Sequence, residues 1–203
     1  FAYDPIVAAG ANACVLHYIT NDQPCQAGDA ILLDVGAEYA NYQADLTRVV
    51  PVSGRFTPRQ RAVYEAVLRV MRQAQQLLFS SNDLAVYQQQ VGTIMERELL
   101  ALGLLDRTDI KNQSPKYPAY KKYFMHGTSH HIGLGTHDVG DVHRKLEPGM
   151  VLTIEPGIYI REEGLGVRLE NVFVIGEKSV ENLMANIPIE VEEIEDLMNG
   201  WSI

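Results

Sequence analysis

The feature that most constrains this chain is a set of four carboxylates within or beside apolar, strand-like segments. Asp34 lies in ILLDVG and Glu155 in VLTIEPG, and each is followed by a second strand-like segment that carries Asp45 or Glu170. Burying carboxylates without a compensating charge is very costly, so the fold must bring positive charge to them. Divalent cations supply that charge, and the four acids therefore predict a metal site.

The first pair of acids fits one antiparallel hairpin. Residues 29–36 read as a buried strand, 43–52 as its partner and EYANY as the turn region. If the turn is centred between Tyr39 and Ala40, Asp34 lies directly opposite Asp45. Directly opposed side chains share a face, with Cβ atoms roughly 5 Å apart, and like charges there repel unless they are neutralised.

The second pair of acids repeats this spacing. Residues 150–160 and 167–175 read as strands around the turn-like REEGLG, and this centre places Glu155 opposite Glu170. A glycine follows the first acid of each pair two residues later, as Gly36 and Gly157. We therefore expect two hairpins that form pseudo-symmetric halves of one site.

Four of the six histidines fall in HGTSHHIGLGTH. The glycines disfavour a helix, and in extended backbone His126 and His130 share a face whereas His131 points away. We therefore interpret His131 as structural and His143 as a surface residue. His17, in VLHYIT, is ambiguous, since a lone histidine in an apolar strand is more often a core residue than a functional one.

Arg168 lies two residues before Glu170, and hence on the same face of a strand. We expect it to donate a charge-assisted hydrogen bond to one of the ligand carboxylates. The alternative is a surface cation that balances Glu162 or Glu163.

Helical periodicity fills the middle of the chain. Thr57 followed by Pro58 predicts a helix start, with apolar spacing to Phe79, and a second amphipathic helix is predicted from about Asp83 to Leu102. Residues 111–122 are polar and read as a loop, and 190–199 read as a short acidic helix. Strand-rich blocks flanking two helices predict an α+β fold, with 1–203 forming a single domain.

The net charge of −9 argues against nucleic-acid binding and against an anionic membrane surface, both of which need clustered basic residues. No apolar run is long enough to span a bilayer. The two cysteines, Cys14 and Cys25, form no CxxC pair, and reduced thiols in the cytoplasm are the default expectation. The start of the chain lacks both an initiator Met and the basic region of a signal peptide.

Long motifs spread over nearly the whole chain resemble the pita-bread metallopeptidases and, among them, aminopeptidase P. These motifs are VLHYITND, LLDVGAEYANYQADLTR, HGTSHHIGLGTHDVGD, LEPGMVLTIEPGIYI and GVRLENVFVI. The resemblance implies pseudo-symmetric antiparallel sheets with flanking helices. It also implies that 1–203 is a catalytic domain, lacking the family's N-terminal domain and the first helices of its catalytic domain.

The resemblance also assigns roles to single residues. The five metal ligands of the family match Asp34, Asp45, His130, Glu155 and Glu170, of which Asp45 and Glu170 would bridge two ions. Asp34 would hold one of these ions, and His130 and Glu155 the other. The substrate-side positions match His17, His126, His137, Tyr3 and Tyr159, and Arg168 matches the arginine that supports the ligands.

The activity expected from the resemblance is release of the first residue from peptides with proline in second position. Two divalent ions per chain are expected, with Mn²⁺ favoured by the carboxylate-rich ligands and Co²⁺, Zn²⁺ or Fe²⁺ as alternatives. Glu155 would take a proton from the attacking water, His137 would donate to the oxyanion and His126 would line the proline pocket. The partner is then a peptide, with a dimer or tetramer expected for the full-length protein.

Other activities share these features. Prolidase and methionine aminopeptidase use the same five ligands, so the ligands alone do not separate them from aminopeptidase P. A metal-free pita-bread module that binds proteins and a creatinase-like hydrolase are further alternatives, but both lack the complete set of acids.

Overall fold

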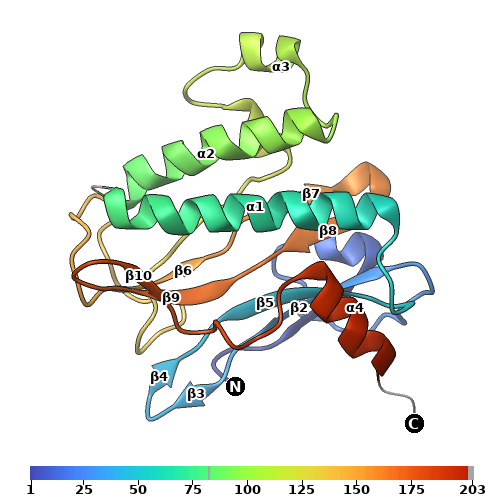
Figure 1. The fold of residues 1–203 in the computed structure, drawn as a ribbon, viewed down its shortest axis with the longest axis horizontal. Helices are drawn as coiled ribbons and strands as arrows, with labels where there is room; N and C mark the ends of the chain where they lie inside the picture. The colour runs from blue at the N-terminus through green and yellow to red at the C-terminus, as the bar shows by residue number, and fades with distance from the viewer. Residues whose placement is uncertain (82, 201–203) are drawn as a thin grey trace.

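The computed structural model describes residues 1–81 and 83–200. Two three-stranded antiparallel sheets and two short hairpins form one layer, and helices cover it on one side (Figure 1). The first sheet has the order β1 (Ile6–Ala9), β2 (Ala30–Val35), β5 (Leu46–Pro51). The second has the order β10 (Val180–Asn182), β9 (Asn171–Ile175), β6 (Val151–Ile154). The hairpins pair β3 (Glu38–Tyr39) with β4 (Tyr42–Gln43) and β7 (Gly157–Ile160) with β8 (Leu165–Arg168).

The first predicted hairpin exists, but its predicted register is wrong. The tight turn is centred between Ala40 and Asn41, which both adopt positive φ, at 52° and 66°. Two residues with positive φ are what a two-residue hairpin turn requires. This turn pairs Asp34 with Thr47 rather than with Asp45. Asp45 therefore lies diagonally across from Asp34.

The second predicted hairpin has the expected register. Gly157 pairs with Arg168 in β7 and β8, and Ile154 pairs with Asn171 in β6 and β9. Both pairs of residue numbers sum to 325, as do 155 and 170, so Glu155 and Glu170 fall opposite each other between the paired stretches. At the tip, Gly164 adopts φ 57° and ends the short 3-10 helix η3 (Arg161–Glu163).

The two central helices form where the sequence predicts them. In α1 (Pro58–Ser80), the Thr57 side chain accepts from the N–H of Gln60 while the Gln60 side chain accepts from the N–H of Thr57. The second helix, α2 (Leu84–Ala101), is capped by Asp83 and packs against α1. Both helices bury apolar residues, among them Val67, Val91 and Met95, and α1 contacts strands β6, β7, β8 and β10.

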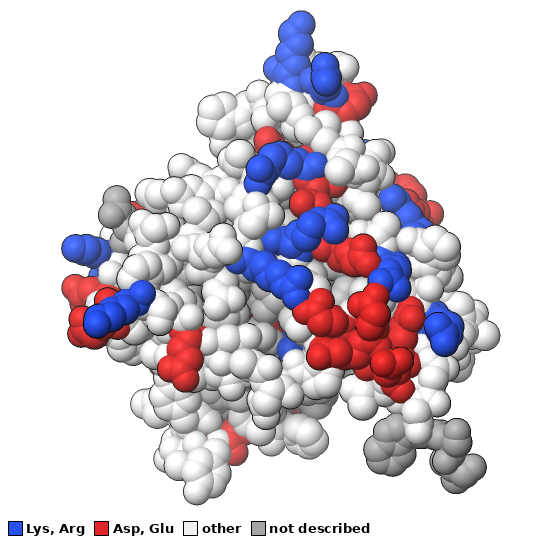
Figure 2. Space-filling view, in the orientation of Figure 1, with Lys and Arg blue, Asp and Glu red and all other residues white. Residues whose placement is uncertain are grey.

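The remaining helices are short. The predicted loop over 111–122 is interrupted, because it contains the end of α3 (Arg107–Asn112) and the 3-10 helix η2 (Ala119–Lys122). A further 3-10 helix, η1 (Gly10–Cys14), packs against β8. The predicted acidic helix is α4 (Val191–Gly200). Figure 2 shows the acidic side chains gathered in the region of α4, where Glu190 and Glu192 form ion pairs with Arg72 and Arg61 of α1.

The two sheets are joined where Thr47 of β5 pairs with Glu170 as an isolated antiparallel bridge. The Glu170 N–H donates to the Thr47 carbonyl at 3.1 Å. Buried Arg48 reinforces the junction by donating to the carbonyls of Thr47 and Glu170 and to the side chain of Asn171. In the described part of the chain, none of the helices has the length and apolar character needed to span a bilayer.

Candidate metal centre

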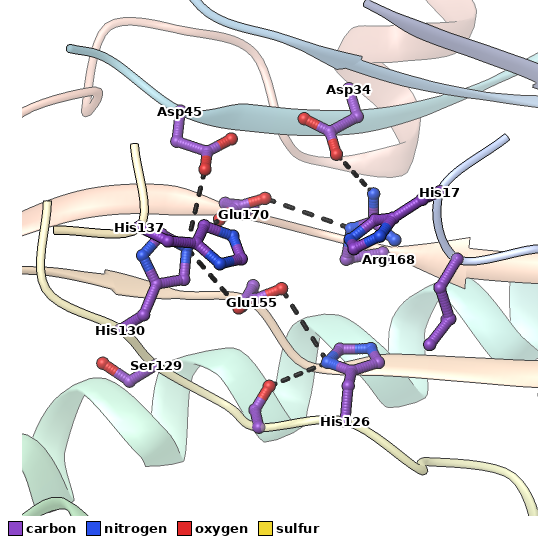
Figure 3. A pocket seen from close by; sticks show the side chains of 12 residues that line it. His17, Asp34, Asp45, His126, Ser129, His130, His137, Glu155, Arg168 and Glu170 are labelled. Atoms are coloured by element: carbon purple, nitrogen blue, oxygen red, sulfur yellow. Dashed lines mark hydrogen bonds and ion pairs between the residues drawn. The ribbon is translucent and has the colours of Figure 1, made fainter. Parts of the chain in front are cut away.

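The predicted site residues converge on one cavity of about 290 Å³ at the junction of the two sheets (Figure 3). Asp34 comes from β2 and Asp45 from the residue before β5, whereas Glu155 and Glu170 come from the short links that follow β6 and β8. The irregular segment before β6 adds histidines to the lining. The predicted residues that line the cavity are His17, Asp34, Asp45, His126, His130, His137, Glu155, Arg168 and Glu170.

The ligand atoms of these residues cluster in two main groups. In one group, Asp34, Asp45 and Glu170 each offer an atom, and in the other His130, Glu155 and Glu170 do so. The atoms of each group lie within 4.8 Å of one another. Glu170 belongs to both groups, as expected for a carboxylate that bridges two cations. A third group joins Asp45 and His130 to His137.

The tautomer of His130 suits a metal ligand. Its Nδ1 lies 3.0 Å from the carbonyl oxygen of His131, and since a carbonyl only accepts, Nδ1 carries the proton. The lone pair on Nε2 then faces carboxylate oxygens of Asp45, Glu155 and Glu170, at 3.5, 3.7 and 3.9 Å. Metal-ligating histidines commonly bind through one nitrogen while the other N–H is fixed by a carbonyl in this way.

Glu170 supplies an independent test of the fit. Its side chain is 2% exposed, and the hydroxyl of Thr47 donates to Oε2 at 2.8 Å. Its other oxygen, Oε1, is buried and has no hydrogen-bond partner among the described residues. A buried carboxylate oxygen without a donor is costly, and a cation shared with His130 would satisfy it. The donor set therefore fits hard divalent cations.

Arg168 donates a hydrogen bond to a carboxylate of the cluster, as expected. This carboxylate is that of Asp34 and not that of Glu170, which lies two residues after Arg168. Its Nη2 lies 2.5 Å from Asp34 Oδ2, whereas Nε lies 4.0 Å from the nearest oxygen of Glu170 and donates to Thr47 instead. Arg168 is 4% exposed, so it is not the surface cation of the alternative interpretation. Glu163, named in that alternative, pairs with Arg59.

Arg168 also begins a chain of hydrogen bonds that reaches His126. Arg168 Nη1 donates to the Tyr159 hydroxyl at 3.0 Å, and that hydroxyl lies 2.8 Å from His126 Nε2. His126 Nδ1 lies 2.7 Å from the carbonyl oxygen of Gly127, so Nδ1 carries the proton and Nε2 accepts from Tyr159. The side chains of Arg168 and Tyr159 thus link Asp34 to His126, with the donor and acceptor of each hydrogen bond assigned.

Tyr3 holds the first pair of acids together from the opposite side. Its hydroxyl lies 2.5 Å from Asp34 Oδ1 and 2.6 Å from Asp45 Oδ1. Tyr3, Asp34 and Asp45 also line a second cavity, next to His17 and His137. Burial, together with both carboxylates, raises the pKa of Tyr3 far above its usual range, so the phenol stays protonated.

The electrostatics of the cavity disfavour uncompensated negative charge. Burial raises the pKa of Glu155 to about 7, against the lowering effect of His130 and Arg168. Burial and the neighbouring Glu155 and Asp45 raise the pKa of Glu170 well above its ordinary value. Burial also raises the pKa of Asp34, although Arg168 opposes this. Cations would relieve all three effects.

The nitrogen bases respond to burial in different ways. Burial lowers the pKa of His126 to about 4, and Arg168 adds to this, so His126 is neutral near pH 7. Burial also lowers the pKa of His130, but the carboxylates of Asp45 and Glu155 outweigh it and raise the pKa overall. The same negative field would attract a cation to Nε2.

The other histidines lie as follows. His17 and His137 are exposed at the cavity wall, and the ring of His137 lies 4.1 Å from that of His130 between centroids. His131 turns away from the cavity, pairs through its backbone with Leu152 and covers Gly140. His143 is exposed, as predicted.

Sequence reasoning missed Thr47, which bonds both Arg168 and Glu170 at the junction of the sheets. Its hydroxyl accepts from Arg168 Nε at 3.1 Å and donates to Glu170 Oε2. Thr47 lies two residues after Asp45 and so shares its face, which is the signal that could have identified it.

Comparisons with known proteins agree with this geometry. The model of the family described as Metallopeptidase family M24 matches residues 1–177. Xaa-Pro aminopeptidase of Haemophilus influenzae is 42% identical over 98% of this chain and 48% of that protein. Xaa-Pro aminopeptidase of Escherichia coli is 41% identical over 97% of this chain and 47% of that protein.

A solved structure of E. coli aminopeptidase P, zinc-substituted and in complex with product, is also similar. It superposes with a TM-score of 0.89 at 40% identity, over 97% of this chain and 47% of that chain. The predicted resemblance and the predicted α+β fold of the aminopeptidase P type are confirmed. The chain spans about half the length of these relatives.

Proposed function

Because this chain belongs to metallopeptidase family M24, we propose that residues 1–203 form the catalytic domain of a metal-dependent aminopeptidase. The proposed enzyme removes the first residue from peptides that carry proline in second position. The observation that carries this proposal is the pair of ligand groups sharing Glu170, combined with relatives named Xaa-Pro aminopeptidase.

Two divalent ions fit the donor set. Asp34, Asp45 and Glu170 would hold one ion, and Asp45, His130, Glu155 and Glu170 the other, with Mn²⁺ favoured by the excess of carboxylates. When bound, such a pair lowers the pKa of a shared water and polarises a carbonyl group. The remaining chemistry belongs to side chains of this protein.

Glu155 is the proposed proton carrier. It lies at the cavity wall, 3.7 Å from His130 Nε2 and 3.8 Å from His126 Nδ1. A carboxylate at this position can take a proton from water and return it to the leaving nitrogen. When proline follows the scissile bond, the leaving nitrogen is the proline nitrogen. It leaves as a secondary amine and must be protonated before it can leave.

His126 and His137 are proposed to bind the substrate. His126 is neutral and held edge-on to Phe124 and Tyr159, with centroid distances of 4.9 and 5.4 Å. Such a rigid aromatic wall suits the apolar ring of proline. His137, exposed beside His130, can donate to the oxygen of the scissile carbonyl, and His17 faces the same space.

The decisive variant is Glu155→Ala in the full-length protein with added Mn²⁺. We expect turnover of an Xaa-Pro-Xaa peptide to fall by about 10²-fold or more, because general acid–base catalysis contributes that much. Glu147→Ala, an exposed acid in the same region, is the matched control and should retain full activity. Near-normal turnover by Glu155→Ala would refute the assignment.

A peptide panel separates the rival activities. Cleavage of Xaa-Pro-Xaa as well as Xaa-Pro supports an aminopeptidase, cleavage of the dipeptide alone indicates prolidase, and cleavage of Met-Ala-Ser indicates methionine aminopeptidase. Metal analysis after chelation tests the metal-free alternatives. Two equivalents of metal restoring activity support the proposal, whereas full activity without metal contradicts it.

For the full-length protein we propose a homodimer or homotetramer. Its oligomeric state can be measured by light scattering. Cys14 and Cys25 are both free thiols, which agrees with the predicted location in the cytoplasm.

A further inference from the structure

A side chain from outside the cavity contacts the segment that carries His126 and His130. We propose that Gln88 of α2 is a positioning residue for the site, acting through Thr128. This inference rests on the proposed function, because it concerns the geometry of the same catalytic groups.

Thr128 is bonded on two sides. Gln88 Oε1 accepts from the Thr128 N–H at 2.7 Å and from its hydroxyl at 2.8 Å. The Thr128 carbonyl in turn accepts from the N–H of Glu155 at 2.8 Å. Thr128 is fully buried, so water does not replace these partners. Gln88 thus fixes the backbone that lies between the two histidines and, one step further, the backbone of Glu155.

The segment depends on such bonds because it has no helix or strand of its own from Met125 to His130. Tyr159 of β7 bonds His126 at one end of this segment. Further anchors come from β6, where Thr153 N–H donates to the His130 carbonyl at 3.0 Å and Ser129 donates to the Thr153 carbonyl at 2.5 Å. Gln88 is an anchor from the helix layer. Through this bond, the packing of α2 helps to determine the positions of His126 and His130.

Loss of the Gln88 oxygen leaves two buried donors of Thr128 without an acceptor. The segment must then move to satisfy them, and small displacements of catalytic groups are costly in rate. We expect Gln88→Leu, which keeps the size and removes the acceptor, to lower kcat about 10–100-fold, the usual effect of losing a supporting partner. KM should change less, because His126 is the one proposed substrate-binding side chain within this segment, whereas His17 and His137 lie outside it.

The test uses the full-length protein with Mn²⁺ and a set of matched variants. Gln88→Glu keeps an acceptor oxygen and should restore most of kcat. Thr128→Val keeps the backbone bond but removes the hydroxyl, and its kcat should fall between wild type and Gln88→Leu. Gln89→Leu, at the exposed neighbouring position, is the control.

Two further readouts do not depend on turnover. Amide hydrogen exchange of residues 126–130 should be faster in Gln88→Leu than in wild type. Mn²⁺ affinity measured by calorimetry should be weaker, because His130 and Glu155 are both displaced.

The proposal is overturned if Gln88→Leu matches wild type in kcat, exchange and Mn²⁺ affinity. It is also overturned if Gln88→Glu fails to restore kcat although it is as stable as wild type, because a role in packing alone would then explain the loss. If wild type cleaves no Xaa-Pro peptide, the proposed function fails, whereas exchange and Mn²⁺ affinity still test the positioning role.

Discussion

At the scale of the residue, Tyr159 connects Arg168, which supports Asp34, to His126, which is proposed to line the proline pocket. Its hydroxyl accepts from Arg168 and donates to His126, and the side chain is 1% exposed. Burial raises its pKa to about 12, so it remains a neutral donor at any working pH. No other group named in the site bonds both Arg168 and His126.

We expect Tyr159→Phe to lower kcat about 10–100-fold, since His126 loses the donor that orients its ring. The free energy of unfolding should fall by about 1–3 kcal/mol, because buried polar groups of Arg168 and His126 lose a partner. Steady-state kinetics and urea unfolding measure the two effects, with Tyr117→Phe as an exposed control. Unchanged kcat alongside reduced stability would limit Tyr159 to a structural role.

Gly36 shows that one missing side chain can set the position of a ligand. A Cβ at this residue would lie 2.1 Å from the carbonyl oxygen of Ala44 and 2.6 Å from the Tyr3 ring. Ala44 precedes Asp45, and Tyr3 bonds Asp45, so both neighbours that would have to move control the same ligand.

We predict that Gly36→Ala lowers the free energy of unfolding by about 1–3 kcal/mol through overpacking. Metal affinity should weaken as well, because Asp45 is displaced. Urea unfolding and calorimetry measure these effects. Gly200→Ala is the control, because no described residue lies within 4 Å of the added atom. If Gly36→Ala has the same free energy of unfolding as wild type, the backbone near Ala44 and the ring of Tyr3 can move without loss of stability, and the prediction is wrong.

At the scale of the element, hairpins and helices could be predicted where local signals set them. The Thr57-Pro58 start fixed α1, and the tip at Gly164 centres the second hairpin. The predicted turn of the first hairpin is centred one residue too early, so the partner of Asp34 differs by two residues, because the turn puts Ala40 at positive φ, a conformation that alanine does not signal. A shift of this kind changes the partner of Asp34 while keeping its face.

Contacts between distant elements could not be predicted from spacing. Arg168 bonds Asp34 across 134 positions, and Gln88 bonds Thr128 across 40. Periodicity reports which face of an element is buried but not which element covers it. The four candidate acids could be singled out because acids in apolar strands are rare, and the family resemblance added His130 to them, whereas Gln88 and Thr47 are common residue types in ordinary positions.

A bidentate ion pair joins α1 to the tip of the second hairpin. Arg59 Nε and Nη2 donate to the two oxygens of Glu163 at 2.8 and 2.7 Å, and Nη1 donates to the Leu102 carbonyl at the end of α2. The hydrogen bond from Arg59 lowers the pKa of Glu163 below its ordinary value.

The pH dependence follows from the direction of this shift. A lowered folded-state pKa gives stability that is present above the unfolded value, roughly 4.3, and is lost as pH falls through the folded value. Because both side chains are about one-third exposed, we expect Glu163→Gln to cost at most about 1 kcal/mol at pH 7. The difference from wild type should shrink as pH falls below the unfolded value. Urea unfolding at pH 7 and at pH 3 tests this, with Glu162→Gln as control, and a difference at pH 3 as large as that at pH 7 would contradict it.

At the scale of the whole molecule, the candidate metal centre joins the two strand-rich halves of the chain. Asp34 lies in the first sheet and Asp45 directly before its strand β5, and Glu155 and Glu170 flank the strands of the second hairpin. Direct contact between the halves includes the Thr47–Glu170 bridge and the hydrogen bonds of Arg48 and Arg168. Metal binding should therefore stabilise the folded protein as a unit.

We predict that Mn²⁺ at 100 times its Kd raises the free energy of unfolding by about 2.7 kcal/mol per site, and that a chelator removes the gain. Urea unfolding with and without Mn²⁺ measures this gain.

Glu170→Gln should abolish most of this gain in the free energy of unfolding, because Glu170 belongs to both main ligand groups. The metal-free variant should nevertheless be at least as stable as the metal-free wild type, since it no longer buries an uncompensated carboxylate. A metal-free Glu170→Gln that is clearly less stable would mean that the carboxylate stabilises the junction through its bond to Thr47. Equal stability of wild type with and without Mn²⁺ would mean that the two halves are already locked together by protein contacts alone.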